Sequence, residues 1–193
     1  MGLLTIREAA LDEFIFEPPN RVIEALYYRF FREQLLQCLE LSTDDMHLSQ
    51  RVSALALRDD MAPLAEALQM VLERLSNRDA HGWSEKHVKA VLMALLVPTG
   101  VYGVFSEWPV GQGYADIYLK RRPPIVEPKH EHLIELKYLK KQEADLAEAV
   151  RQGGRRQVEA YLSQPDVARQ GDVLGWLMLI VGTEVKVEHV GAP

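Results

Sequence analysis

Two acidic residues and a lysine lie in stretches of this sequence that alternate in polarity as β-strands do. Asp116 is inside Tyr114–Lys120, and Glu135 and Lys137 are two residues apart inside Leu133–Tyr138. Because successive side chains of a strand point to opposite faces, Glu135 and Lys137 share one face, about 6.6 Å apart along the strand. If the two strands are neighbours, two carboxylates and one ammonium group converge on one surface.

Carboxylates gathered in this way repel each other, and a divalent cation relieves the repulsion. Oxygen ligands favour a hard ion, so the expected cofactor is Mg²⁺ or Mn²⁺. Such an ion lowers the pKa of a bound water and neutralises a phosphate oxygen, while Lys137 orients the water or stabilises the transition state. The group therefore indicates hydrolysis of a phosphodiester bond. Without Asp116, a Glu-x-Lys pair is more typical of an exposed salt bridge, and Asp116 alone is compatible with a solvated strand face.

The elements that position these residues begin with helices, which are predicted over most of the first half of the sequence. Asn20 and Ser84 are good N-caps, and apolar residues recur at helical spacing after each. The predicted helices cover residues 20–39, Asp44–Leu57, Ala62–Leu75 and 84–96.

The period then changes to that of strands. Residues rich in β-branched and aromatic side chains predict strands over Val101–Glu107, Tyr114–Lys120 and Leu133–Tyr138, the first two joined at hairpin distance by Val110–Gly113. A helix over Gln142–Leu162 follows, with Gly153-Gly154 as a weak spot or break. Val173–Val181 and Glu184–Val190 predict a closing hairpin.

Composition and charge limit the classes of protein. The chain has 193 residues, 48% of them hydrophobic and 26% charged, which predicts one globular domain, or one domain plus an appendage. The net charge of −6 excludes a non-specific polyanion binder, but residues 101–165 carry 10 basic and 9 acidic side chains, so this is the segment where nucleic acid would bind if it is involved. Its one cysteine, Cys38, excludes an intramolecular disulfide and is expected to pack in the core. No apolar run is long enough for a membrane span and no signal-peptide pattern is present, so we expect a cytoplasmic protein without a membrane partner.

Three short motifs occur in a meaningful order: Gly113-Tyr114-Ala115-Asp116, Ile134-Glu135-Leu136-Lys137 and Gln157-Val158-Glu159-Ala160-Tyr161. Together they resemble the PD-(D/E)XK nuclease superfamily in its RecB-like form, whose members read G-x-x-D, (D/E)-x-K and Q-x-x-x-Y. The resemblance implies an α/β (α+β) fold: a helical N-terminal region followed by a restriction-endonuclease-like core, with a mixed central sheet flanked by helices.

The same resemblance implies roles for the motif residues. Asp116 and Glu135 would be metal ligands and Lys137 the catalytic lysine. Gln157 would help to orient the catalytic residues, and Tyr161 would contact the edge of the active site or the DNA. Ordinary packing between helix and sheet is the alternative for Tyr161.

A narrower resemblance covers more of the chain. It rests on Gly2-Leu3-Leu4-Thr5-Ile6, Pro19-Asn20-Arg21-Val22, Ser84-Glu85-Lys86-His87, and Ser106-Glu107 before Gly111-Gln112-Gly113. These stretches are similar to the C-terminal part of a family that joins an AAA-ATPase-like domain to a PD-(D/E)XK nuclease domain. That implies residues 1–16 as the tail of a preceding module, 17–80 as a helical subdomain, 81–193 as the nuclease-like domain, and a fused or separate ATPase-like partner. A strand over Gly2–Glu8, for which the sequence shows no partner, agrees with such a tail, and no Walker-A pattern is present.

Further candidates surround the three central residues. Superfamily members often place an acid on the helix before the strands, which favours Glu85 as a third metal ligand; an acidic residue in a first helical turn also complements the helix dipole. Glu107 could hydrogen-bond a neighbouring group of the site or lie at an exposed strand end. His87 is expected to pack on its helix rather than bind metal.

Five basic residues lie close in sequence to the last motif and could contact phosphates: Lys140, Lys141, Arg151, Arg155 and Arg156. A solvated helix face is the more usual explanation for such a run of charge.

The leading hypothesis is therefore a Mg²⁺- or Mn²⁺-dependent nuclease acting on DNA, with weak DNA binding by this chain alone because its N-terminal half is acidic. One alternative is a catalytically silent module of the same fold that holds DNA or a partner for an AAA-type ATPase. Another is an interaction domain in which residues 17–80 form a helical dimerisation surface, and hence a homodimer.

Overall fold

The computed structural model describes residues 4–10, 13–42, 46–79, 83–122, 128–169 and 172–191. Its elements in chain order are β1 (Thr5–Ala10), β2 (Glu13–Glu17), α1 (Arg21–Cys38), α3 (Leu48–Arg58), α4 (Ala62–Asp79), α5 (Glu85–Leu96), the 3-10 helix η1 (Val97–Thr99), β3 (Tyr102–Val110), β4 (Gly113–Arg121), β5 (Glu131–Leu139), the 3-10 helix η2 (Lys141–Leu146), α6 (Ala147–Leu162), α7 (Pro165–Ala168), β6 (Val173–Val181) and β7 (Glu184–Val190).

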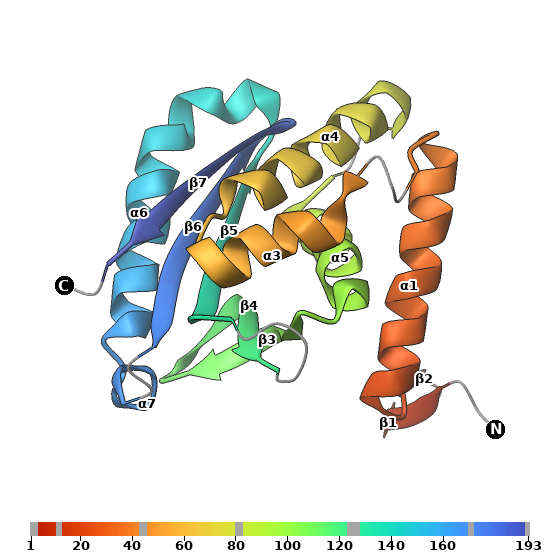
Figure 1. The fold of residues 1–193 in the computed structure, drawn as a ribbon, viewed down its shortest axis with the longest axis horizontal. Helices are drawn as coiled ribbons and strands as arrows, with labels where there is room; N and C mark the ends of the chain where they lie inside the picture. Colours follow the sequence, from red (N-terminus) through yellow and green to blue (C-terminus); the bar gives the residue numbers. More distant parts are fainter. Residues whose placement is uncertain are drawn as a thin grey trace.

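One mixed sheet contains five strands in the order β3-β4-β5-β6-β7. β5 and β6 are parallel, and the other neighbouring pairs are antiparallel. The parallel pair needs a long crossover connection, which α6 supplies. The order of helix, three-stranded meander, helix and further strands confirms the predicted mixed sheet flanked by helices (Figure 1).

Helices cover both faces of this sheet, with α3, α4 and α5 on one side and α6 on the other (Figure 1). The larger core joins those three helices and the end of α1 to sheet residues such as Ile117 and Ile134. A smaller core under α6 contains Tyr118 and Leu133. Because both faces are covered, the central strands are largely apolar. Glu135 is therefore a carboxylate inside a strand that is buried on both sides.

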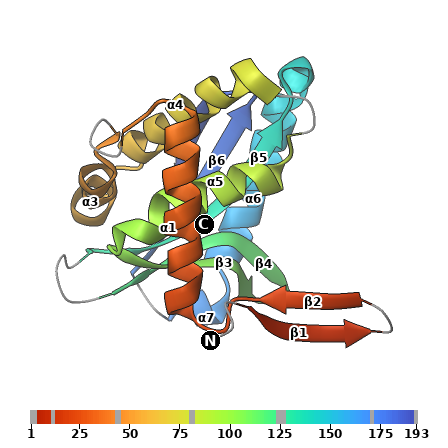
Figure 2. The same ribbon diagram turned by 90° about the vertical axis from the view of Figure 1, so that its right-hand side faces the viewer.

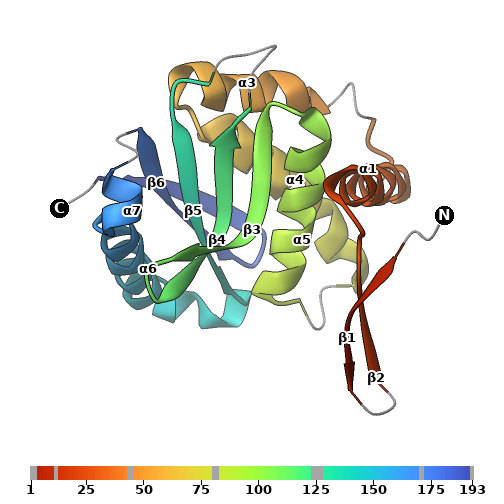
Figure 3. The same cartoon turned by 90° about the horizontal axis from the view of Figure 1, so that it is seen from below.

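The N-terminal strand has a partner, so the prediction of an isolated strand over Gly2–Glu8 is wrong. β1 pairs antiparallel with β2, with Thr5 opposite Glu17. Figures 2 and 3 show this hairpin projecting away from the rest of the molecule. β2 escapes prediction from the sequence because it is only five residues long and lies directly before the Pro18-Pro19 stop.

α1 begins after its N-cap Asn20, as predicted, but its apolar stripe is buried only at one end. Leu35 and Leu39 are in the core, whereas Tyr27 and Phe31 are 37% and 41% exposed. The first half of α1 therefore presents apolar side chains to solvent.

α6 runs without a break through Gly153 and Gly154, where the sequence predicted a weak spot. A Cβ atom on Gly154 would lie 2.6 Å from Cδ1 of Leu177, so this glycine permits close packing of α6 on the sheet. The first residues of the predicted helix over Gln142–Leu162 form the 3-10 helix η2 instead.

Two smaller predictions also need correction. The helix predicted from Asp44 begins at Leu48, and residues 43–45 are outside the described residues. Cys38 is exposed rather than packed in the core. Within the described ranges, no helix is both long and apolar enough to cross a bilayer.

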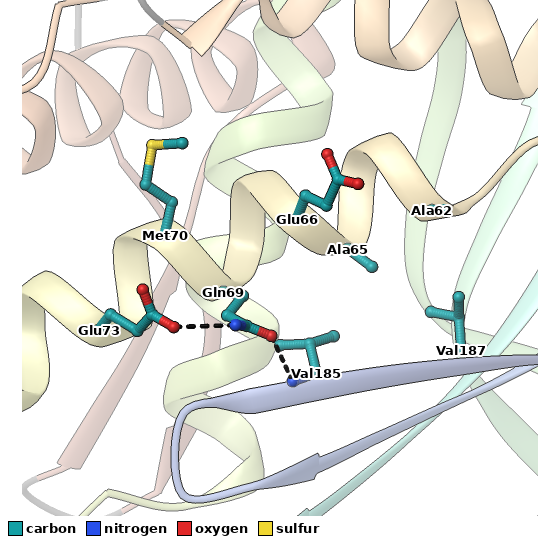
Figure 4. Close-up of a pocket in the computed structure, with 8 residues that line it drawn as sticks. All are labelled: Ala62, Ala65, Glu66, Gln69, Met70, Glu73, Val185 and Val187. Atoms are coloured by element: carbon teal, nitrogen blue, oxygen red, sulfur yellow. Dashed lines mark hydrogen bonds between the residues drawn. The ribbon is translucent and has the colours of Figure 1, made fainter.

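A shallow cavity of about 330 Å³ lies between α4 and the edge strand β7 (Figure 4). Gln69 links the two elements: its Oε1 accepts a hydrogen bond from the backbone N–H of Val185 at 3.1 Å, and its Nε2 donates to Glu73 at 2.8 Å. An edge strand leaves backbone groups unpaired, and Gln69 satisfies one of them. The contacts of this cavity are thus structural.

Candidate active site

The β4–β5 ladder stops one residue pair before Asp116 and Glu135, at the pair Ile117–Ile134. Beyond that point a side chain replaces the contact between backbones: Oδ2 of Asp116 accepts a hydrogen bond from the backbone N–H of Leu136 at 2.9 Å. The Asp116 side chain is only 13% exposed. The two strands are neighbours, as the sequence predicted, and they diverge where the two acidic residues lie.

Glu135 is 2% exposed, and one of its oxygens has no hydrogen-bond partner among the described residues. Its Oε1 accepts a hydrogen bond from Nζ of Lys137 at 2.6 Å, while Oε2 is buried and unpaired. The pKa of Glu135 is raised to about 7, chiefly by burial and also by the carboxylates of Asp116 and Glu85, against the opposing effect of Lys137. Glu135 is therefore held ready for one more proton or cation.

Lys137 forms an ion pair with Glu135. Burial alone would lower the pKa of Lys137, but its hydrogen bond to Glu135 and the neighbouring carboxylates outweigh this and raise the pKa. Lys137 thus keeps its positive charge at neutral pH.

A second lysine, Lys89, was not predicted from the sequence and completes the group of charged residues around Asp116. Nζ of Lys89 donates to Oδ1 of Asp116 at 3.1 Å and to Oε1 of Glu107. Burial would lower the pKa of Lys89, yet these two carboxylates raise it overall. The available signal was its position, because Lys89 is four residues after Glu85 and so on the same face of α5.

Glu107 lies inside β3, not at the strand end that the sequence predicted. Its φ of 50° is in the left-handed region, which a non-glycine residue adopts at a cost. Neither Glu107 nor Asp116 belongs to the β3–β4 ladder, although the pairs on both sides of them do. The local distortion of β3 accompanies the contact of Glu107 with Lys89.

The N-terminus of α5 brings Glu85 to the same region. The pKa of Glu85 is raised by burial and then by Asp116, while Lys137 and a backbone hydrogen bond from Tyr138 lower it. His87 is exposed and stays at the start of its own helix, where its Nδ1 accepts a hydrogen bond from the backbone N–H of the N-cap Ser84 at 3.2 Å.

Gln157 and Tyr161 on α6 hold the start of β4. Nε2 of Gln157 donates to the hydroxyl of Tyr161 at 2.7 Å, and that hydroxyl donates to the carbonyl of Tyr114 at 2.9 Å. The Tyr161 ring packs across Gly113, where a Cβ atom would meet it at 3.3 Å. Both side chains thus act on the backbone two residues before Asp116, and neither donates to Asp116, Glu135 or Lys137 directly.

The basic residues of α6 are largely engaged with carboxylates. Arg151 and Arg155 bind the two oxygens of Glu188 at 2.6 and 2.7 Å, and Arg155 also binds Glu159 at 3.0 Å. Lys140, Lys141 and Arg156 are exposed. The exposed face of α6 therefore carries a network of solvated ion pairs, which agrees with the solvated helix face given above as the alternative to phosphate binding.

A metal ion is implied by this set of residues, and the donor chemistry fits one. In the part of the chain that the structure describes, no three histidine, cysteine, aspartate or glutamate side chains are gathered closely enough to form a ready-made metal cage. Asp116 raises the pKa of both Glu85 and Glu135, so the three carboxylates lie near one another without forming such a cage. Mg²⁺ binds proteins through one or two carboxylates and keeps several waters, and the unpaired Oε2 of Glu135 is an acceptor that lacks a donor.

The mixed sheet, its helical layers and the divergence of β4 and β5 at two carboxylates together define a restriction-endonuclease-like fold. The family model of the PD-(D/E)XK nuclease superfamily matches residues 83–190, more than half of the chain, and the chain belongs to this superfamily. No curated protein matches the sequence at a significant level. The family match leaves the narrower AAA-ATPase-associated family as a prediction.

Proposed function

We propose that this chain is a Mg²⁺- or Mn²⁺-dependent nuclease that hydrolyses phosphodiester bonds in DNA. Membership of the superfamily supports a nuclease. The observation that carries the metal dependence is the unpaired, buried Oε2 of Glu135, in the field of Asp116 and Glu85. A buried carboxylate oxygen without a donor is costly unless a cation or proton satisfies it.

Asp116 and Glu135 would hold the ion, with Glu85 as a third acid. When bound, the ion would neutralise a phosphate oxygen and lower the pKa of a bound water. Lys137, fixed 2.6 Å from Glu135, carries a positive charge that is positioned to stabilise the developing charge of the transition state. Gln157 and Tyr161 are positioning residues, because they hold the backbone that carries Asp116.

A catalytically silent DNA-binding module is the second candidate, and Lys89 is the observation in its favour. Its ammonium group bridges Asp116 and Glu107, as a metal ion would bridge two carboxylates. A nuclease must release Asp116 from Lys89, at least in part, when it binds metal. A silent module would keep the ion pair.

Nicking of supercoiled plasmid DNA separates the two candidates. The nuclease proposal expects nicking with Mg²⁺ or Mn²⁺, none in EDTA, and a loss of at least about 100-fold in Asp116→Asn. Asp166→Asn, an exposed aspartate on α7, is the matched control and should cleave normally. DNA binding without nicking under all these conditions would support the silent module.

Partners other than DNA belong to the proposal as well. We propose a fused or separate AAA-ATPase-like module, or a second copy of the chain, on the side of the β1–β2 hairpin. Apolar side chains on that side support a protein partner, since Leu4 and Phe30 are 50% and 62% exposed. Light scattering, with Phe30→Glu as the variant, would separate a homodimer from a monomer that needs another partner.

A further inference from the structure

A groove of about 600 Å³ lies between the first half of α1 and the β3–β4 hairpin. Figure 3 shows α1 alongside α5, on the side of the sheet where β3 is the edge strand. Five basic residues line the groove, and none of its lining residues is acidic: Arg21, Arg29, Lys120, Arg121 and Arg122. On a chain of net charge −6, a concave surface of one sign concentrates a positive potential.

Most of this positive charge is not neutralised within the described part of the molecule. Arg29, Lys120 and Arg122 are exposed and form no ion pair with the residues that the structure describes. Arg21 lies over the ring of Phe105, 3.9 Å from its centroid, and makes no contact with a carboxylate there. Among these five basic residues, Arg121 alone has acidic partners in the described part of the chain, at 3.1 Å from Asp172 and 4.0 Å from Glu131. On α6, in contrast, Arg151 pairs with Glu188, and Arg155 pairs with both Glu188 and Glu159.

The groove also lies at a useful distance from the candidate active site. Lys120 follows Asp116 by four residues on β4, which corresponds to about 13 Å along the strand. One strand of a DNA duplex covers that span in about four nucleotides, at about 3.4 Å each. A phosphate backbone that occupies the groove can therefore reach Asp116 within the same half-turn of DNA.

We propose that this basic groove binds the sugar–phosphate backbone of the nucleic-acid substrate and sets its register at the active site. The inference rests on the proposed function, because it assigns a binding surface to the same substrate. In this proposal the phosphate contacts come from basic residues of α1 and the end of β4, and not from those of α6. Backbone contacts of this kind supply affinity and orientation but no sequence specificity.

The test is DNA binding by the whole chain in EDTA, where cleavage is absent, with a labelled 20-base-pair duplex as the probe and fluorescence anisotropy as the readout. The variant is Arg29→Glu/Arg122→Glu, and the matched control is Arg156→Glu/Arg169→Glu, with the same change in net charge on exposed residues of the α6–α7 side. The groove variant should bind roughly tenfold or more weakly, and the salt dependence of its affinity should flatten by about two units of slope. The control should stay within about threefold of the wild-type chain, and both variants should keep the wild-type melting temperature.

Three results would overturn the groove: an equal loss in variant and control, no binding of the duplex by the wild-type chain, or binding of polyglutamate in its place. Plasmid nicking, measured separately, keeps the two proposals distinct. If the wild-type chain nicks plasmid DNA but the groove variant binds DNA as tightly as the wild type, the groove proposal is refuted and the nuclease proposal stands. If only the groove variant loses DNA affinity and the wild-type chain does not nick DNA, the groove proposal is supported and the nuclease proposal is refuted.

Discussion

The carboxylate of Asp116 accepts a hydrogen bond from the backbone N–H of Leu136 at 2.9 Å, at the point where β4 and β5 separate. Leu136 lies between Glu135 and Lys137, so this one bond fixes the position of Asp116 relative to both. It also satisfies a backbone donor that the ended ladder leaves without a strand partner. The separation of β4 and β5 thus leaves the backbone N–H of Leu136 free to bind Asp116, and this bond brings Asp116 next to Glu135 and Lys137.

Glu135 should make the stability of the metal-free chain depend on pH. Its pKa is raised to about 7 in the folded chain, above the ordinary value of 4.5, so the folded state binds the proton more tightly. The stabilisation is therefore fully present below about pH 4.5 and is lost as the pH rises through about 7. In EDTA, wild-type stability should fall between pH 5 and 8 by on the order of 2 kcal/mol more than that of Glu135→Gln. Urea titrations at several pH values measure this difference in the free energy of unfolding. Glu33→Gln, at an exposed position of α1, is the control and should follow the wild type. The same pH dependence of stability in Glu135→Gln and the wild type would contradict the raised pKa of Glu135.

Mg²⁺ or Mn²⁺ should raise the melting temperature, because an ion that binds only the folded state stabilises it. At a concentration about 100 times the dissociation constant, the gain is about 2.7 kcal/mol. Asp116→Asn should lose most of this gain, and Asp166→Asn should retain it. A melting curve of the wild-type chain that does not move in millimolar Mn²⁺ would favour the silent module.

Lys89→Met should destabilise the metal-free chain by about 1–3 kcal/mol, since it leaves the largely buried carboxylate of Asp116 without its ion pair. Mn²⁺ should then stabilise this variant more than it stabilises the wild type, because the ion no longer competes with the ammonium group. Lys86→Met, an exposed lysine on the same helix, is the control. Thermal melts with and without Mn²⁺ provide the measurement, and equal metal effects in Lys89→Met and wild type would show that Lys89 does not oppose the metal.

The two adjacent glycines of α6 should respond oppositely to alanine. Nothing lies within 4 Å of a Cβ atom on Gly153, so Gly153→Ala should gain about 0.5–1 kcal/mol from helix propensity. In Gly154→Ala the new methyl group would meet Leu177 at 2.6 Å and Lys137 at 3.3 Å, and overpacking typically costs about 1–3 kcal/mol. Denaturant unfolding of both variants checks the contrast; similar stabilities would mean that α6 moves freely on the sheet.

The central part of the site was predictable because strand alternation alone places Glu135 and Lys137 on one face and motif order places Asp116 on the neighbouring strand. The individual helices and strands followed from the change of hydrophobic period at residues 97–101, whereas their arrangement as a mixed sheet flanked by helices was implied by the resemblance to the PD-(D/E)XK superfamily. Such patterns predict helices and strands well because each pattern is repeated over many consecutive residues.

Other features depend on contacts between distant residues, which a single sequence does not carry. The pairing of Lys89 with Glu107 and Asp116 joins α5, β3 and β4, and no spacing along the chain encodes it. Helix propensity predicted a weak spot or break at Gly153-Gly154, whereas α6 is continuous there and Gly154 packs closely on Leu177. The engagement of Arg151 and Arg155 by Glu188 likewise required the position of β7.

The most direct test of the account is single-turnover cleavage of a labelled DNA duplex by wild type, Lys137→Ala and the exposed-lysine control Lys141→Ala, with DNA affinity measured on the same proteins. Lys137 acts on the transition state, so Lys137→Ala should cleave about 100- to 1,000-fold more slowly while binding DNA within about threefold of wild type. Lys141→Ala should be unchanged in both. Cleavage that survives Lys137→Ala, or a folded wild-type chain that does not cleave with Mg²⁺ or Mn²⁺, would contradict the account.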